Sequence, residues 1–518
     1  MTQARMVKGL PRVYVWTGRD GMDQIAIGGD CVRLSASKSF GPHGTFSIDI
    51  LPRTSDRVQT VGDLRKLAKL YQAIKPNAPI SIGMERDGGI LLGLVDRIGR
   101  TRKFGSQVMY GLQITGRCCG KAFTDNLVKA TTAVQEYVAF RAKVAAALGA
   151  DHPLIYDLEG TWGPEDEQGF PVFVGTTVLD VVRWFIDHAP TMNIPILEDV
   201  SGGGGKIGDY VTISSTGNIS TLLVGDDVTT WNDARIWSEG LHTYQGTIYG
   251  FLMGSVLDQD FYECWMDYVP SAGPLPNIVL MIRPKPFDEP ALEFYPIDEQ
   301  TGATWADLRT MVDQKPYHEI GFDEVFSENL GISDADAFSV FKVTGKHSLC
   351  GNEQMDAEGL SYPLVCTWNA KKHGVKSYNT SLNLVGANLT KKAAGDEDYT
   401  AEVDADIKQF RGRIFNWNRL NSRMETGNIE VMGRDSYRIG DRVRLAWAIP
   451  PVASKSGKDD EIGMVYYTVG VSWSWMYGGD YTTSLQLTRG HNDSMITALK
   501  EEILADAPAT NPDHFAAT

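Results

Sequence analysis

The stretch YYTVGVSWSWMYGGDYTTSLQLTRG, residues 466–490, decides the fold that the sequence predicts. Residues 478–480, Gly-Gly-Asp, suit a three-residue hairpin connection in which glycine supplies positive φ angles. This loop places Tyr477 opposite Tyr481 and gathers the large side chains of both strands on one face. A two-residue loop would mix the faces, and a one-residue slip would turn every side chain over. We therefore expect a hairpin with one face on a core and one face in water.

The expected register assigns the residues of this hairpin to its two faces. Trp475 lies opposite Thr483 and Trp473 opposite Leu485 on the apolar face, because directly opposed side chains of a ladder share a face. The other face then carries small, uncharged and mostly hydroxyl-bearing side chains: Ser472, Ser474, Thr482, Ser484 and Gln486.

Length and charge bound the class of protein. At 518 residues the chain is longer than a single hydrophobic core usually supports, which favours about two to four domains. A net charge of -16 disfavours a general nucleic-acid binder, because such proteins bind phosphates through cationic groups. No run approaches the ~20 apolar residues of a membrane span, and no apolar signal segment opens the chain. We expect a soluble protein, made in the cytosol, without stable membrane insertion.

The first 149 residues are typical of strands arranged around one helix. Thr60 is expected to cap a helix over residues 61–74, with Asp63 completing a capping box. Strand-like pieces split by glycine-containing turns follow, and then a long helix over residues 124–148. The apolar stripe of the first helix comprises Val61, Leu64, Leu67, Tyr71 and Ile74.

From residue 150 the chain changes to longer loops, with a helix expected over residues 178–188. Further helices are expected over residues 333–343, over residues 401–422 and from Ser494, before a mobile tail. Aromatic residues indicate that the middle segment has a core of its own: Trp231, Trp237, Tyr244, Tyr249, Phe251, Phe261, Tyr262 and Trp265.

Two distant hairpins share a short pattern. The stretch over residues 93–117 contains Leu-Gln-Ile-Thr at 112–115, and the opening stretch contains Leu-Gln-Leu-Thr at 485–488. In each, a strand that begins at a glycine, Gly93 or Gly470, runs into a turn and returns as this pattern. Four matched residues are compatible with a duplication and also with convergence, because alternating strands resemble one another.

Signatures of catalysis are weak or missing. Four glycines precede Lys206, but Ile207 follows it, so the spacing of a phosphate-binding loop fails. Nine histidines are dispersed, with no two spaced to share a metal on a helix face. The cluster Glu165, Asp166 and Glu167 lies in a loop without the apolar surroundings that acid catalysis needs, and no GxSxG elbow is present. We assign no catalytic, cofactor-binding or metal-binding residue.

Six cysteines are scattered without a metal-binding spacing. Free, partly buried thiols are the favoured interpretation. The adjacent Cys118 and Cys119 aim their thiols apart. An interchain disulfide is an alternative that the sequence does not decide.

Several long stretches resemble the baseplate hub proteins of tailed phages and related contractile injection machines. The RPKPF element at residues 283–287 and the stretch from GDRV to LTRG, residues 440–490, are the most specific. The family has no catalytic motif to transfer, and the lysozyme domain of some associated spike proteins has no counterpart here. The matching stretches follow the family's order and cover most of the chain: residues 93–117, 250–268, 278–288, 318–343, 415–445 and 466–490.

The resemblance implies an α+β, β-rich fold with two tube-like antiparallel β-barrel domains, flanking helices and a middle insertion domain. The expected bounds are residues 1–149 for the first barrel domain with its helices, 150–335 for the middle α+β domain, 336–491 for the second barrel domain and 492–518 for a C-terminal helix and tail. Three copies would present six similar barrels to a six-fold tail tube, and a repeated barrel would explain the Leu-Gln-apolar-Thr pattern that the two hairpins share. The channel of this ring would be lined by the polar residues Ser472, Ser474, Thr482, Ser484 and Gln486.

The resemblance implies a structural role without catalysis or cofactor. The chain would form a homotrimer that joins a tail tube or tube-initiator protein to a central spike, beside other baseplate proteins, and DNA would transit its acidic channel without specific binding. It would be assembled in the host cytoplasm and located in the tail baseplate of the virion. Two alternatives stay open: a cell-wall glycan hydrolase that uses carboxylates and sugar-stacking aromatics of the middle segment, and a receptor- or carbohydrate-binding tail module.

Overall fold

The computed structural model describes residues 9–129, 211–214, 245–253, 259–269, 277–285, 317–345, 364–382, 414–450 and 462–499, with short gaps in the longer pieces. The helix expected over residues 178–188, most of the helix expected over 401–422, and the acidic cluster at residues 165–167 lie outside these ranges.

Most described residues lie in strands, so the β-rich part of the prediction is confirmed. Short 3-10 turns lie at Gly28–Asp30, Phe322–Glu324 and Asn421–Arg423. The strands and helices in chain order are β1 (Arg12–Thr17), β2 (Asp23–Ala26), β3 (Cys31–Ser39), β4 (Thr45–Ile50), α1 (Val61–Ala73), β5 (Pro79–Gly83), β6 (Leu91–Phe104), β7 (Val108–Cys118), α2 (Lys121–Asp125), β8 (Leu127–Lys129), β9 (Val211–Ser214), β10 (Gln245–Thr247), α7 (Ile248–Phe251), β11 (Tyr262–Val269), β12 (Asn277–Pro284), β13 (Tyr317–Ile320), β14 (Val325–Gly331), β15 (Val340–Gly345), β16 (Leu364–Val365), α10 (Thr367–His373), β17 (Ser377–Leu382), β18 (Glu425–Met432), β19 (Arg442–Leu445), β20 (Met464–Met476) and β21 (Tyr481–His491).

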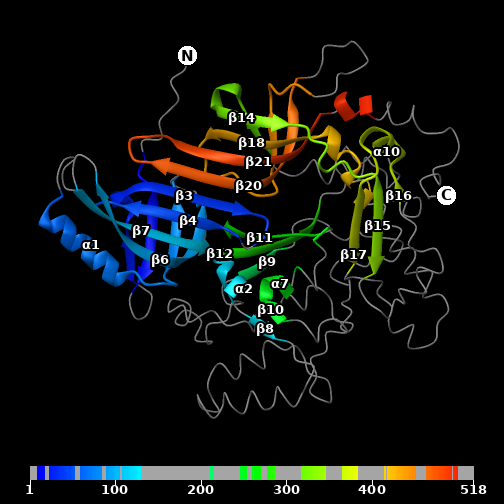
Figure 1. The fold of residues 1–518 in the computed structure, drawn as a ribbon. Coiled ribbons are helices and arrows are strands. Elements are labelled where there is room, and N and C mark those ends of the chain that lie inside the picture. The colour runs from blue at the N-terminus through cyan, green and yellow to red at the C-terminus, as the bar shows by residue number, and fades with distance from the viewer. Residues whose placement is uncertain are drawn as a thin grey trace, which may run out of the picture.

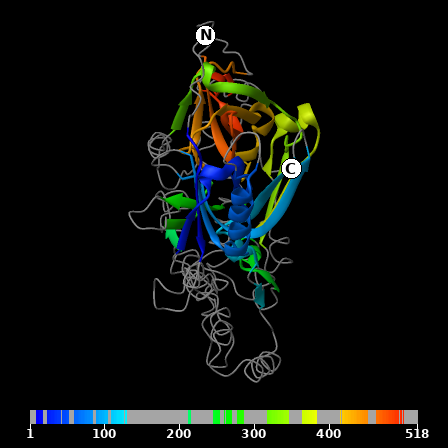
Figure 2. The same ribbon diagram turned by 90° about the vertical axis from the view of Figure 1, so that its left-hand side faces the viewer.

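One large, curled, mainly antiparallel sheet dominates the fold (Figures 1 and 2). Its strands follow the order β14-β18-β21-β20-β3-β4-β7-β6-β5-β1-β2, with β19 beside β20 and β13 beside β19. Of its described pairings, only that of β13 with β19 is parallel. The expected start of the last domain at residue 336 leaves out β13 and β14, yet both strands belong to this sheet because they pair with β19 and β18.

The β20–β21 hairpin has the predicted faces but a different register. Trp475 pairs with Tyr481 and Trp473 with Thr483, two residues from the expected register, because residues 477–480 form the connection. The backbone N–H of Tyr477 donates to the carbonyl of Val32 in β3 at 2.9 Å and so leaves the hairpin ladder. A shift of two residues preserves both faces, which is why the assignment of faces survives.

The helix α1 confirms the capping box and corrects the apolar stripe. The Thr60 side chain accepts from the Asp63 backbone, and the Asp63 carboxylate accepts from the Thr60 backbone N–H at 2.8 Å. Asp63 is buried by this cap, and the face that it shares with Leu67 and Leu70 turns to the core. Leu67 and Ile74 of the expected stripe are buried, whereas its other three residues lie at the surface: Val61 is 66% exposed, Leu64 39% and Tyr71 36%.

Strands occupy the described parts of two expected helices, and residues 130–148 of the helix expected over residues 124–148 lie outside the described residues. α2 ends at Asp125, and residues 127–129 form β8, which pairs with β10 instead of continuing a helix. Within the helix expected over residues 333–343, β15 begins at Val340 and pairs with β16 and β17. Ala337, Ser339 and Phe341 are buried in alternation, which is the period of a strand. The short helix from Ser494 is confirmed over residues 494–496 and 498–499.

Two sets of six strands follow the same path through the large sheet. The first unit is β1, β3, β4, β5, β6 and β7, which lie side by side as β3-β4-β7-β6-β5-β1. The second unit is β13, β14, β18, β19, β20 and β21, which lie as β14-β18-β21-β20-β19-β13. A 3-10 turn precedes the second strand of each unit. The units differ at their ends, since β1 is antiparallel to β5 and β13 is parallel to β19.

The shared sequence pattern lies on equivalent strands of the two units. Residues 112–115 belong to β7 and residues 485–488 to β21. Gln113 lies opposite Gly99, and Gln486 lies opposite Gly470. The equivalent of Gly470 is therefore Gly99 and not Gly93, as the sequence alone suggested. This match in both path and register supports a duplication within the chain.

The two units join directly. β3 of the first unit pairs antiparallel with β20 of the second, from Arg33 opposite Met476 to Ser39 opposite Gly470. A smaller sheet, β11-β12-β9, lies against this junction (Figure 1). Asp267 of β11 lies 3.5 Å from the ammonium of Lys38 and 3.7 Å from the guanidinium of Arg438, so one carboxylate binds a cation from each unit.

Candidate functional site

The polar face of the large sheet is continuous across both units. One row of directly opposed residues crosses seven strands: Ser327, Glu430, Ser484, Ser472, Ser37, Thr45 and Arg117. The neighbouring row is Met432, Thr482, Ser474, Ser35, Ser47, Thr115 and Arg97. The hydroxyls of Ser37 and Thr45 are 2.8 Å apart, so neighbouring strands also bond through their side chains.

All five residues that the sequence singled out lie on this face. Ser472, Ser474 and Gln486 are exposed, and Thr482 and Ser484 are half-buried. Their neighbours Trp473 and Leu485 point to the opposite side and are almost completely buried. The structure therefore brings the five together on one surface; whether that surface lines a channel stays a prediction.

Sequence reasoning missed the half of this face that the first unit provides. Gly99 and Gln113 are the equivalents of Gly470 and Gln486, and Thr101 takes the place of Ser472. The shared Leu-Gln-apolar-Thr pattern could have located them, once Gly99 had been aligned with Gly470.

The charge of the face differs from the acidic lumen that the net charge suggested. On the strands from β14 to β6 the described charges of the face balance: the carboxylates are Glu430, Asp49 and, bound to Arg117 at the β6 bulge, Asp96, and the cations are Arg33, Arg97 and Arg117. Arg117 binds Asp96 at 2.9 Å and Asp125 at 2.7 Å, and these contacts raise the pKa of its guanidinium. The described face is hydroxyl-rich and not acidic, so the carboxylates that give the chain its charge lie elsewhere.

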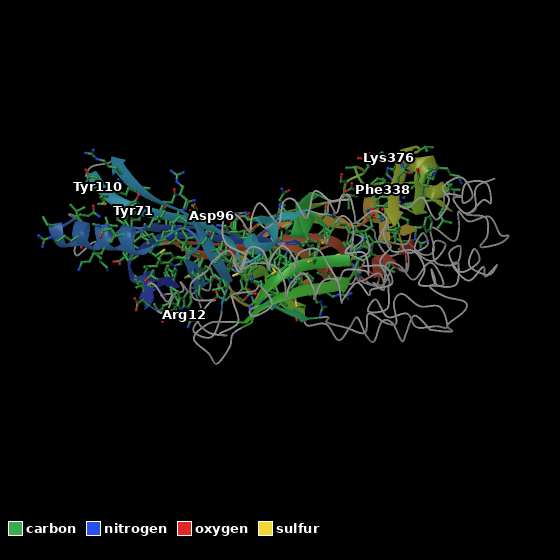
Figure 3. The ribbon with its side chains drawn as sticks, turned by 90° about the horizontal axis from the view of Figure 1, so that it is seen from below. Arg12, Tyr71, Asp96, Tyr110, Phe338 and Lys376 are labelled. Atoms are coloured by element: carbon green, nitrogen blue, oxygen red, sulfur yellow. The ribbon has the colours of Figure 1, made fainter. Side chains whose placement is uncertain are left out.

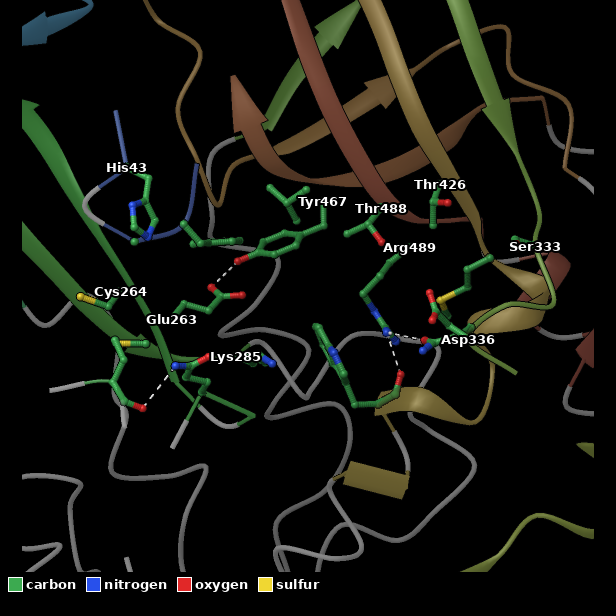
Figure 4. A pocket seen from close by; sticks show the side chains of 18 of the residues that line it. His43, Glu263, Cys264, Lys285, Ser333, Asp336, Thr426, Tyr467, Thr488 and Arg489 are labelled. Carbon is green, nitrogen blue, oxygen red and sulfur yellow. Dashed lines mark hydrogen bonds between the residues drawn. The ribbon is translucent and has the colours of Figure 1, made fainter. Parts of the chain in front are cut away.

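A cavity of about 550 Å³ lies where the two most specific stretches of the sequence meet (Figure 4). Lys285 of the RPKPF element and Arg489 of the LTRG end both line it, together with Glu263 and Tyr467. The Tyr467 hydroxyl donates to the Glu263 carboxylate, which fastens β20 to β11. Burial lowers the pKa of the Lys285 ammonium, and Asp260 and Glu263 oppose this effect.

Arg489 holds the wall of this cavity. Its guanidinium lies 3.7 Å from the centre of the Trp417 ring and donates to the Trp417 carbonyl at 2.7 Å. Its backbone has a φ of 58°, a left-handed conformation that non-glycine residues seldom adopt. The two stretches therefore serve a structural junction between the small sheet and the second unit.

One aromatic residue of the middle segment, Trp265, lies in the core. Trp265 is buried against Phe40, with ring centres 5.5 Å apart, so its ring is not available to stack on a sugar. No group of three or more metal-ligating side chains occurs in the described part of the chain.

Among the described residues no helix is long and apolar enough to span a membrane. Cys31, Cys118, Cys119, Cys264 and Cys366 are free thiols, and Cys350 lies outside the described ranges.

Neither the protein-family models nor the curated proteins contain a match to the chain. The chain is similar to the solved structure of a tail protein of Neisseria meningitidis, with 12% identity, 94% of this chain and 99% of that chain covered, and a TM-score of 0.45. It is also similar to a 43 kDa tail protein of a Shewanella oneidensis prophage, with 12% identity, 92% and 98% of the two chains covered, and a TM-score of 0.42. A third similar structure is a component of the type VI secretion system of E. coli, with 8% identity, 90% and 74% of the two chains covered, and a TM-score of 0.34.

Proposed function

We propose that this protein is a structural hub of a phage tail baseplate, in which three copies form a ring with six similar units. The observation that carries the proposal is the repeated path of six strands within one chain. A trimer of a duplicated chain presents six equivalent surfaces, which lets a three-fold assembly bind a six-fold tail tube on one side and a central spike on the other.

The polar sheet face supports a channel as the function of this ring. Residues such as Ser35, Ser472 and Thr482 are short and uncharged, so they offer few groups that bind phosphates. DNA would pass such a wall without specific binding. The sliding surface would be a neutral one, made by hydroxyls, and not the acidic one that the net charge suggested.

The proposed domains follow from the two units. The first barrel domain would be built on β1 to β7 and the second on β13 to β21, with the middle α+β domain between them. Because β13 begins at Tyr317, the second barrel domain would start before residue 336. Each barrel would close only within the ring, with the apolar side packed outward on helices and the polar side on the channel.

The experiment is imaging of intact tails by electron microscopy, together with the mass of the purified chain in solution. We expect three copies at the junction of tube and spike, with an open axial channel. A single copy per tail, or an axis filled by apolar side chains of this protein, would contradict the proposal. A monomer that degrades cell walls would favour the hydrolase.

A further inference from the structure

The edge of β6 lacks the partner that its equivalent has. In the second unit, β20 pairs with β19 over residues 464–467 and then with β3 over residues 470–476. In the first unit, β6 pairs with β5 over residues 91–94. No described strand pairs with the same edge of β6 from Gly99 onward. The first unit thus presents a strand edge that the second unit has covered.

The matching edge lies on β14. This strand is the equivalent of β3, and it ends the large sheet, since β18 is its one described neighbour (Figure 1). Five of its seven residues are exposed, and Phe326 within the strand and Ile332 just after it place apolar surface in water. Unpaired strand edges readily accept a strand from another chain. Among the described strands, the edges of β6 and β14 occupy matching positions, so the two edges can pair between two copies.

We infer that β14 of one copy pairs antiparallel with β6 of the next copy, and so repeats between chains the β3–β20 junction within the chain. The inference rests on the proposed ring, and it names the surfaces that close that ring. Within the chain Ser35 lies opposite Ser474. When β3 is matched with β14 and β20 with β6, Ser35 corresponds to Gly331 and Ser474 to Lys103. Gly331 of one copy would then lie opposite Lys103 of the next, and the polar face would continue across the contact without a break.

The distribution of charge favours this contact. Residues 1–130 hold 20 of the 49 Lys and Arg but 10 of the 65 Asp and Glu, so this segment carries +10 and the remainder -26. The same equivalences place Arg100 of β6 opposite Asp334, which follows β14. Both side chains are exposed in the single chain. Residues 317–336, which contain β14, hold six Asp and Glu and no Lys or Arg. A basic first unit facing this acidic segment of the next copy steers the copies head to tail.

The surface near β6 has the composition of an interface. The Arg100 guanidinium lies 5.1 Å from the centre of the Tyr71 ring, and that of Arg102 lies 5.3 Å from the centre of the Tyr110 ring. Figure 3 shows Tyr71 and Tyr110 at the same end of the molecule, on α1 and at the tip of the β6–β7 hairpin. Tyr and Arg are enriched in the buried centres of protein interfaces. Exposed Leu64 of α1 adds apolar area there.

Cysteine cross-linking tests the contact. In the doubly substituted chain Gly331→Cys with Lys103→Cys, mild oxidation should link copies into dimers and closed trimers on a non-reducing gel. A side chain at Gly331 meets no atom within 4 Å, so the cysteine fits. The matched reference is Ser35→Cys with Ser474→Cys, the equivalent pair inside one chain, which should close in any oligomeric state. The pair Gly331→Cys with Arg102→Cys, one residue out of register, should give far less product.

The outcomes separate this inference from the proposed function. A trimer by mass, with the internal pair closed but no link between Gly331→Cys and Lys103→Cys, would overturn the β14–β6 contact and leave the ring intact. A chain that stays monomeric at every concentration, alone and with its tail partners, would overturn both. Cross-linked trimers whose yield matches that of the internal pair would establish the contact.

Discussion

Ser35 of β3 lies directly opposite Ser474 of β20, and this pair belongs to the ladder that joins the two units of six strands. On the other side of the same ladder Ala36 lies opposite Trp473. One side of the junction is thus polar and wet, and the other is part of the core. This contrast makes the faces of the sheet directly testable.

Replacing Trp473 by alanine should destabilise the protein strongly. The ring is 1% exposed and its Nε1 donates to the Arg434 carbonyl at 2.9 Å. Emptying this space should lower the free energy of unfolding by about 3–5 kcal/mol. The neighbouring Ser474→Ala, on the exposed face, should change it by less than about 0.5 kcal/mol. Chemical denaturation measures both, and equal losses would contradict the assignment of faces.

Replacing Arg489 by lysine should weaken the junction at the cavity. Lysine cannot keep both the contact with the Trp417 ring and the hydrogen bond to the Trp417 carbonyl. We expect a loss of about 1–3 kcal/mol in the free energy of unfolding. Arg65→Lys, on the exposed side of α1, is the control and should be neutral. A thermal melt that is the same for Arg489→Lys and for the wild type would show that Arg489 has no structural role.

The sequence predicted those features that depend on local pattern. Alternation along residues 466–490 identified both faces of the hairpin, and the Thr60 cap located α1. The register of the hairpin was wrong by two residues, because Tyr477 bonds to Val32, more than 400 positions away in the sequence. A local pattern carries no information about such a partner.

The same limit explains the helices that the sequence misplaced. Residues 127–129 extend a helical pattern, yet they pair with residues 245–247, which lie far along the chain. The duplication was visible only as four shared residues, whereas the paths of twelve strands repeat in the structure. The polar-face residues of the first unit were missed because the glycine chosen for the alignment, Gly93, was not the structural equivalent of Gly470.

The buried cysteines should make the protein less stable at high pH. Burial raises the pKa of Cys31 and of Cys264 from 9.0 to about 12. Between these values the unfolded chain releases the thiol protons and the folded chain keeps them, so the unfolded state binds fewer protons and stability falls as the pH rises. Each thiol adds a slope of up to about 1.4 kcal/mol per pH unit. Below pH 9 the effect should vanish.

Thiol labelling with mass spectrometry and alkaline denaturation check this prediction. At pH 8 a thiol with a pKa of about 12 is ionised to about one part in ten thousand, so Cys31 and Cys264 should resist iodoacetamide in the folded chain and react after unfolding. Cys31→Ala should flatten the loss of stability above pH 9. Rapid labelling of either cysteine in the folded protein would contradict their burial.

Reversing one charge at the contact between copies should weaken the ring, and reversing both should restore it. Arg100→Glu faces Asp334 of the next copy in the inferred register, and Asp334→Arg faces Arg100. Each single change should cost about 1 kcal/mol of association free energy per interface, because like charges then lie opposite each other across a ladder. The double variant should recover most of this loss. Sedimentation at low and high salt measures the association, and wild-type association should weaken as salt rises.

Because both side chains are exposed, neither change should alter the melting temperature of the single chain by more than a few degrees. That measurement separates a weakened contact from a damaged fold. If the two single effects simply add in the double variant, Arg100 and Asp334 do not face each other across the interface. Recovery in the double variant alone would place the basic first unit of one copy against the acidic segment around β14 of the next.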